Sequence, residues 1–138
     1  MDATAREQRL LMLVLRFVGI VDSFAVVAIF LPLEWMATIH AWLGLGVMPE
    51  QPIVNYLTRS ASSMYALHGA MILFVSTDVR RYAPLIRFLA IAALIHGVAL
   101  FLIDTLAGMP GFWIVLEGPT VIATGIIVLM VQRHEPKA

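Results

Sequence analysis

The chain contains no cysteine and few charged residues. Of its 138 residues, 13% are charged and 61% are hydrophobic, and the formal net charge is zero. Soluble domains average about 25% charged and about 45–50% apolar residues, so this composition argues against a water-soluble domain. The absence of cysteine excludes disulfides, thiolate metal sites and thiol catalysis. The zero net charge gives no electrostatic reason to expect a nucleic-acid partner.

Recognised catalytic motifs are missing as well. The sequence contains no GxSxG, HExxH, Walker loop or dinucleotide-binding fingerprint. We therefore expect a protein without enzymatic activity. Carboxylates inside the apolar segments leave one alternative open, a proton-coupled membrane enzyme or carrier.

Long apolar stretches dominate the remaining sequence. They cover residues 10–33, 60–77, 85–106 and 112–131, and about 20 helical residues suffice to cross a bilayer. Short connections between helices favour antiparallel neighbours. The sequence thus predicts one domain over residues 1–138, an all-α polytopic membrane protein. Its four transmembrane helices are expected to form an antiparallel bundle.

The first connection carries two tryptophans, Trp35 and Trp42, seven residues apart. This spacing places both on one face of a helix, and tryptophan is enriched at membrane–water interfaces. We expect a short interfacial helix here, ended by the Gly44-Leu45-Gly46 segment.

Basic residues are distributed unevenly between the two sides of the predicted bundle. Cytoplasmic loops of membrane proteins carry an excess of lysine and arginine. With four crossings, Arg59 alone of the nine basic residues falls on the outer side. The pattern predicts a multi-pass membrane protein with both termini in the cytoplasm. The remaining eight are Arg6, Arg9, Arg16, Arg80, Arg81, Arg87, Arg133 and Lys137.

Polar side chains inside the apolar segments mark the candidate site. Ionisable groups at membrane depth are costly, face the bundle interior or water, and often mark functional sites. We expect them to line a pocket for a hydrophobic ligand, a quinone or a lipid. An accessory subunit of a larger membrane complex, or a homo-oligomer, is an equally open role. The candidate residues are Asp22, Arg59, Tyr65, His68, His96, Asp104 and Glu117.

These polar residues also have structural interpretations. Each histidine could donate a hydrogen bond to a carboxylate or backbone carbonyl, and Asp22 could bond to His68 or His96. Asp104 and Glu117 could pair with Arg59, because a cation stabilises a carboxylate in apolar surroundings.

A haem b group is the alternative cofactor. His68 and His96 could supply its two axial ligands, since the glycine that follows each histidine leaves room for a macrocycle. No other metal site is expected, and the cofactor is otherwise unknown.

Several landmarks follow one another from residue 59 onward: Arg59-Ser60, Tyr65, Gly69, Arg80-Arg81, His96, Pro110 and Glu117-Gly118. In these features the chain resembles the DoxX-like group of small bacterial four-helix membrane proteins. The resemblance implies a four-helix bundle in the bacterial cytoplasmic (inner) membrane; some members of the group are associated with quinone-linked redox or with accessory subunits.

Overall fold

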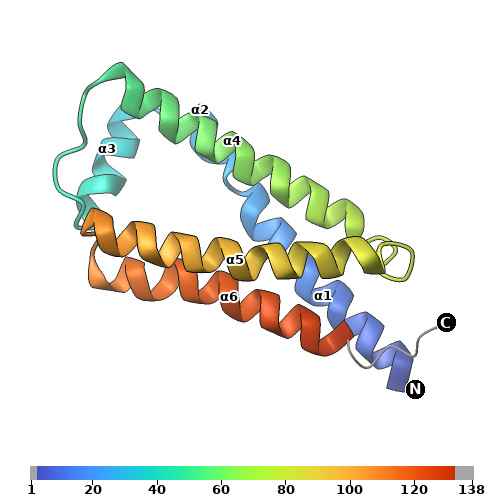
Figure 1. Ribbon diagram of the computed structural model, residues 1–138. Coiled ribbons are helices and arrows are strands. Elements are labelled where there is room, and N and C mark those ends of the chain that lie inside the picture. Colours follow the sequence, from blue (N-terminus) through green and yellow to red (C-terminus); the bar gives the residue numbers. More distant parts are fainter. Residues whose placement is uncertain (1–2, 133–138) are drawn as a thin grey trace. The chain divides into compact units, whose positions relative to one another are not determined.

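A computed structural model describes residues 3–132, and every regular element in that range is an α-helix (Figure 1). The predicted all-α class is therefore confirmed. In chain order the helices are α1 (Ala3–Ser23), α2 (Val26–Phe30), α3 (Leu33–Trp42), α4 (Pro52–Val75), α5 (Ala83–Ala107) and α6 (Gly111–Gln132).

The chain divides into two compact units, which are described separately here. Unit 1 comprises residues 1–14 and 75–138, and unit 2 comprises residues 15–74. The prediction of one membrane domain over the whole chain stays a prediction. Arg133 and Lys137, which the sequence assigns to the basic side, lie outside the described residues.

In unit 1, α5 and α6 form an antiparallel pair joined by a tight turn (Figure 1). Gly108 ends α5 with a left-handed backbone, φ 69°, which glycine adopts without steric cost. The Met109 N–H then donates to the Asp104 carbonyl at 3.0 Å, the closing bond of a Schellman motif. The predicted helices 85–106 and 112–131 are confirmed to within two residues at each end.

Small residues set the distance between α5 and α6. A Cβ atom on Gly97 would lie 2.8 Å from the Gly118 carbonyl oxygen, and one on Gly118 would lie 2.6 Å from the Gly97 carbonyl oxygen. Farther along, a Cβ on Gly125 would lie 2.8 Å from the Ala90 carbonyl oxygen. The two backbones are therefore in direct contact, as is common for membrane helices with small interfacial residues.

The first apolar stretch folds differently from the single helix that the sequence predicts. It breaks at Phe24 and Ala25, between α1 and α2. The Ser23 hydroxyl donates to the Gly19 carbonyl at 2.6 Å, a side-chain bond that often bends helices. The Ala25 N–H then donates to the Asp22 carbonyl at 3.1 Å, an i→i+3 bond of the tighter 3₁₀ type.

Helix α3 confirms the short helix predicted around the two tryptophans. Trp35 and Trp42 are 63% and 82% exposed, so neither is packed into the described chain. The helix ends as expected, with Gly44 at φ 76° and the Leu45 N–H bonded to the His40 carbonyl at 3.2 Å.

Three helical segments, rather than the predicted four, are long and apolar enough to cross a membrane. They are Ala5–Phe30, Ala83–Ala107 and Gly111–Gln132. The predicted fourth span at residues 60–77 is not among them, although the helix α4 that contains residues 60–75 is 24 residues long. Helix α4 begins at Pro52, and its first half is too polar for the helix to count among these three apolar segments. The polar residues of that half are Asn55, Thr58, Arg59, Ser60, Ser62 and Ser63.

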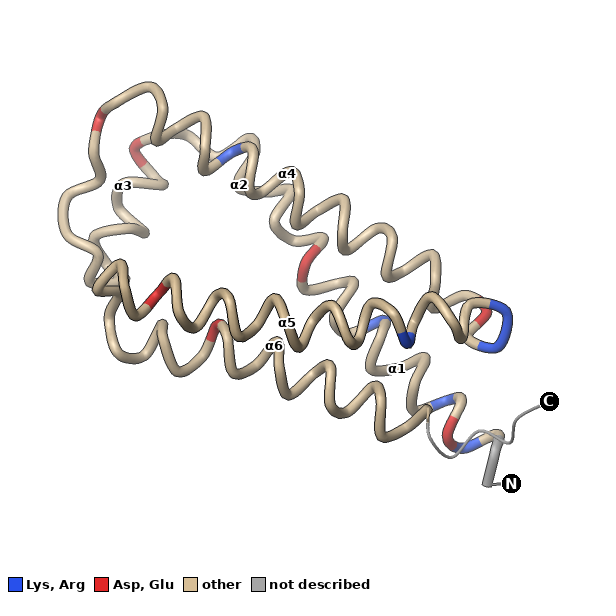
Figure 2. The backbone as a smooth tube through the Cα atoms, in the orientation of Figure 1, with Lys and Arg blue, Asp and Glu red and all other residues tan. Residues whose placement is uncertain are grey.

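Charges separate along unit 1 (Figure 2). We call "the basic end" the part of unit 1 that contains residues 6–9 and 76–87. It holds the arginines 6, 9, 80, 81 and 87 beside the carboxylates Glu7 and Asp78. Asp104 and Glu117 lie toward the other ends of α5 and α6.

Candidate functional site

A polar pair in unit 2 joins α1 to α4. His68 Nδ1 lies 2.8 Å from Asp22 Oδ2, so the imidazole N–H donates to the carboxylate. The sequence left the partner of Asp22 open between two histidines, and the structure identifies His68. This contact restrains the orientation of the imidazole ring.

Close contact between the two helix backbones positions this pair. A Cβ atom on Gly69 would lie 2.5 Å from the Ser23 backbone nitrogen and 2.7 Å from the Gly19 carbonyl oxygen. Any side chain at residue 69 would therefore push α1 and α4 apart. Asp22 lies next to Ser23 and His68 next to Gly69, so the contact of small residues brings the carboxylate within reach of the imidazole.

The imidazole of His68 remains accessible after it bonds to Asp22. Its side chain is 47% exposed, whereas that of Asp22 is 22% exposed. Met64 and Met71 precede and follow His68 by four and three residues, so they share its helix face, and they are 72% and 47% exposed. The second ring nitrogen, Nε2, is thus available on an apolar surface of flexible methionine side chains.

Arg59 occupies a second polar position in unit 2. Its Nη2 donates to the Leu31 carbonyl at 3.0 Å, its Nε donates to the Asn55 side chain at 2.8 Å, and its Nη1 donates to the Ile29 carbonyl. The guanidinium thereby ties α4 to the chain that follows the α1–α2 break. Tyr65 lies on the same helix, three residues before His68, and is 42% exposed.

The other three candidate residues belong to unit 1. His96 is exposed on α5. Asp104 is 5% exposed, and its Oδ2 finds no hydrogen-bond partner among residues 3–132. Glu117 accepts a hydrogen bond from Nε1 of Trp113, one helical turn earlier.

The seven residues predicted to line one pocket are thus divided between the two units. Asp22, Arg59, Tyr65 and His68 belong to unit 2, and His96, Asp104 and Glu117 belong to unit 1. Among these residues, the structure joins Asp22 and His68 by a side-chain hydrogen bond. A pocket shared by all seven, and the ion pair of Arg59 with Asp104 or Glu117, stay predictions.

The haem alternative requires histidines from both units and also stays a prediction. A carboxylate bonded to Nδ1 is compatible with metal ligation through Nε2, because ligating histidines usually donate their other N–H to an acceptor. Within residues 3–132, no group of three or more His, Cys, Asp or Glu side chains could hold a metal ion.

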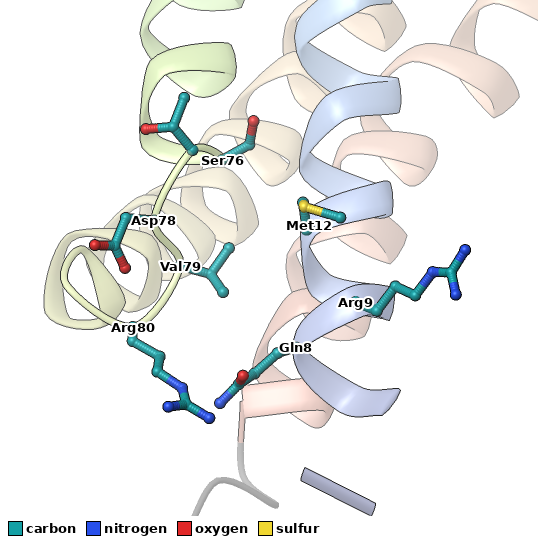
Figure 3. A pocket seen from close by; sticks show the side chains of 8 residues that line it. Gln8, Arg9, Met12, Ser76, Asp78, Val79 and Arg80 are labelled. Atoms are coloured by element: carbon teal, nitrogen blue, oxygen red, sulfur yellow. The ribbon is translucent and has the colours of Figure 1, made fainter. Parts of the chain in front are cut away.

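A pocket of about 250 Å³ lies at the basic end of unit 1, where the sequence did not place a site. Gln8, Arg9 and Met12 of α1 line one side, and residues 76–80 line the other (Figure 3). None of the seven predicted residues takes part. The clustering of arginines was the available signal, but it indicated orientation in the membrane rather than a cavity.

Comparison of the chain with protein families, with curated proteins and with solved structures finds no match in any of the three. The resemblance to the DoxX-like group therefore stays a prediction.

Proposed function

We propose that the protein is a membrane-embedded binding protein for a hydrophobic ligand with a hydrogen-bonding head group, such as a quinone. The observation that carries the proposal is the Asp22–His68 pair. It consists of a carboxylate and an imidazole 2.8 Å apart, with the imidazole about half exposed between two exposed methionines.

The two ring nitrogens of His68 have different roles in this proposal. Nδ1–H donates to Asp22, so Nε2 of the neutral ring is an acceptor and can bond a quinol hydroxyl. In the protonated ring Nε2–H is a donor and can bond a quinone carbonyl, while Nδ1–H still donates to Asp22. Both redox forms of a quinone would find a partner at one nitrogen, while its ring and apolar tail pack against Met64 and Met71.

Binding of a short-chain ubiquinone to the purified protein in detergent tests this proposal. Replacing His68 with Ala removes the hydrogen bond to the ligand, worth about 1.5–3 kcal/mol when one partner is charged, so we expect affinity to fall about 10- to 100-fold. Replacing Asp22 with Asn should weaken binding less, because the amide oxygen can still accept the Nδ1–H bond.

His40→Ala is the matched control. It removes a histidine whose Nδ1 lies 3.1 Å from the Gly46 carbonyl, outside the long apolar helices. Equal ubiquinone affinity of His68→Ala and the wild-type chain would refute the proposal. A Soret band that disappears in both His68→Ala and His96→Ala would instead establish the haem alternative.

We further propose that α4 crosses the membrane despite its polar residues. In unit 1, Gln8 and Arg9 lie beside residues 76–80, shortly before α5 begins. If the segment Ala5–Phe30 and α5 both cross, they start from the same side, so the chain has to cross back between them. The 24 residues of α4, at about 1.5 Å per residue, exceed a hydrocarbon core of about 30 Å.

Hydrogen bonds within α4 support this fourth crossing. The Thr58 hydroxyl donates to the Val54 carbonyl at 2.9 Å, and the Ser62 hydroxyl donates to the Thr58 carbonyl at 2.8 Å. Such internal bonds lower the cost of placing hydroxyl groups in lipid, where polar groups must be satisfied within the protein.

Labelling of introduced cysteines tests the crossing with no background, because the natural chain has no cysteine. A membrane-impermeant thiol reagent should label Arg81→Cys from the cytoplasmic side alone. It should label Val47→Cys, at a position 93% exposed, from the opposite side alone. Labelling of both variants from one side would show that α4 does not cross.

The location that we propose is the cytoplasmic membrane of a bacterium, with both termini in the cytoplasm. The arginines gathered at the basic end of unit 1 support this orientation through the positive-inside rule. Membership of the DoxX-like group, and a role as an accessory subunit or homo-oligomer, are compatible with the same bundle. Native mass spectrometry of gently extracted protein would report both the bound ligand and the oligomer size.

A further inference from the structure

We infer that the pocket at the basic end of unit 1 binds the phosphate group of an anionic phospholipid. The pocket, of about 250 Å³, is large compared with the roughly 30 Å³ that one water molecule occupies in the liquid. It lies between the first turns of α1 and the connection from α4 to α5 (Figure 3).

Two side chains face each other across this pocket. Arg80 extends from the connection toward Gln8 of α1, while the guanidinium of Arg9 points away from the connection (Figure 3). A guanidinium presents several N–H donors in a planar fork that matches phosphate oxygens. The Gln8 amide adds two N–H donors, so Arg80 and Gln8 together can hold one phosphate from opposite sides.

The one carboxylate among the lining residues is held by the connection itself. Asp78 accepts a hydrogen bond from the Arg81 backbone N–H at 3.0 Å, and its side chain points away from α1 (Figure 3). Asp78 therefore shapes the connection and does not face the position proposed for the phosphate. The arginines of the basic end outnumber its two carboxylates, Glu7 and Asp78, which leaves the surroundings favourable to an anion.

The position of the pocket favours a lipid over a soluble anion. Helix α5 begins at Ala83, directly after the connection, and the Gln132 side chain at the end of α6 donates to the Ala83 carbonyl at 3.1 Å. Both helices are apolar enough to span a membrane, so their ends place residues 76–80 at head-group depth. Met12 and Val79 add apolar surface to the lining, suited to the glycerol and upper acyl chain of a lipid.

Native mass spectrometry of the intact protein, with phosphatidylglycerol and phosphatidylcholine added in equal amounts, tests the inference. The wild-type chain should retain phosphatidylglycerol preferentially. Arg80→Gln should lower phosphatidylglycerol affinity about fivefold or more, and Gln8→Ala should lower it about threefold with no change in charge.

Arg81→Gln is the matched control. It removes the same charge from the next residue, whose guanidinium lies 5.6 Å from the centre of the Tyr82 ring and which does not line the pocket. We expect Arg81→Gln to change the affinity for phosphatidylglycerol less than about twofold. Equal losses for Arg80→Gln and Arg81→Gln would show that general surface charge attracts the lipid and would overturn the inference. Retention of both lipids alike by the wild-type chain would overturn it too.

A further binding measurement distinguishes a lipid ligand from a free phosphate ester. Glycerol 3-phosphate carries the phosphate without acyl chains, so we expect it to bind at least about tenfold more weakly than the lipid, given about 0.8 kcal/mol per buried CH₂. Equal affinity would assign the pocket to a soluble anion and overturn the lipid as its ligand. None of these variants alters Asp22 or His68, so the result is independent of ubiquinone binding.

Discussion

The contact between α1 and α4 gives the most direct prediction, because it positions the Asp22–His68 pair. We consider the replacement of Gly69 with Ala, which adds a single methyl group. That atom would lie 2.5 Å from the Ser23 backbone nitrogen, 2.6 Å from the Ser23 hydroxyl oxygen and 2.7 Å from the Gly19 carbonyl oxygen. Two of these three atoms belong to a helix backbone, so side-chain rotation cannot relieve the overlap and the helices have to separate.

The magnitude follows from two opposing effects. Overpacking of a tight contact costs about 1–3 kcal/mol, while Ala in place of Gly inside a helix returns up to about 1 kcal/mol. We therefore expect Gly69→Ala to lower the free energy of unfolding by about 1–2 kcal/mol. Separation of the helices should also lengthen the Asp22–His68 bond and weaken ubiquinone binding.

Unfolding of the purified protein in mixed micelles with rising SDS, followed by circular dichroism, measures this change. Gly111→Ala is the matched control, because a Cβ there meets no atom within 4 Å; its free energy of unfolding should stay within about 0.5 kcal/mol of the wild-type value. If Gly69→Ala and Gly111→Ala unfold at the same SDS fraction, α1 and α4 do not touch at Gly69 and our account of the pair is wrong.

Three further predictions concern stability and use the same unfolding assay. Gly118→Ala should lower the free energy of unfolding by about 1–2 kcal/mol, since the new Cβ would lie 2.6 Å from the Gly97 carbonyl oxygen. An unchanged free energy of unfolding would contradict direct backbone contact between α5 and α6. Arg59→Met should lower the free energy of unfolding by about 2 kcal/mol, because it removes the donor to two backbone carbonyls. A decrease below about 0.5 kcal/mol would show that these hydrogen bonds contribute little to stability. Asp104→Asn should leave stability unchanged or raise it, because the buried Oδ2 accepts no hydrogen bond within residues 3–132; a loss above about 1 kcal/mol would reveal a partner that depends on the charge.

The fourth predicted span shows where sequence reasoning reached its limit. Residues 60–77 contain an apolar second half that resembles a membrane helix, but α4 begins at Pro52. Proline is well suited to the first turn of a helix, so α4 starts eight residues before the predicted span. The early start places Arg59 and its polar neighbours inside the helix. Helix α4 is therefore long enough to cross a membrane, but its composition is too polar to identify it as a membrane span.

The sequence by itself determined the helical class and the limits of α5 and α6. Long apolar segments have to satisfy their backbone groups internally, which in a membrane favours helices. Local signals then fix the ends: Pro84 lies in the first turn of α5, and Gly108 supplies the left-handed residue after its last turn.

Only the tertiary structure decided which polar groups meet. Asp22 had two histidines as possible partners, and the choice depends on the depth and rotation of one helix against another, which no local pattern encodes. The contact between Gly19 and Gly69 fixes the depth and rotation of α4 against α1, and it thereby makes His68 the partner of Asp22. The pocket beside Arg80 likewise exists because the chain brings residues 8–12 next to residues 76–80, segments that are more than sixty positions apart in the sequence.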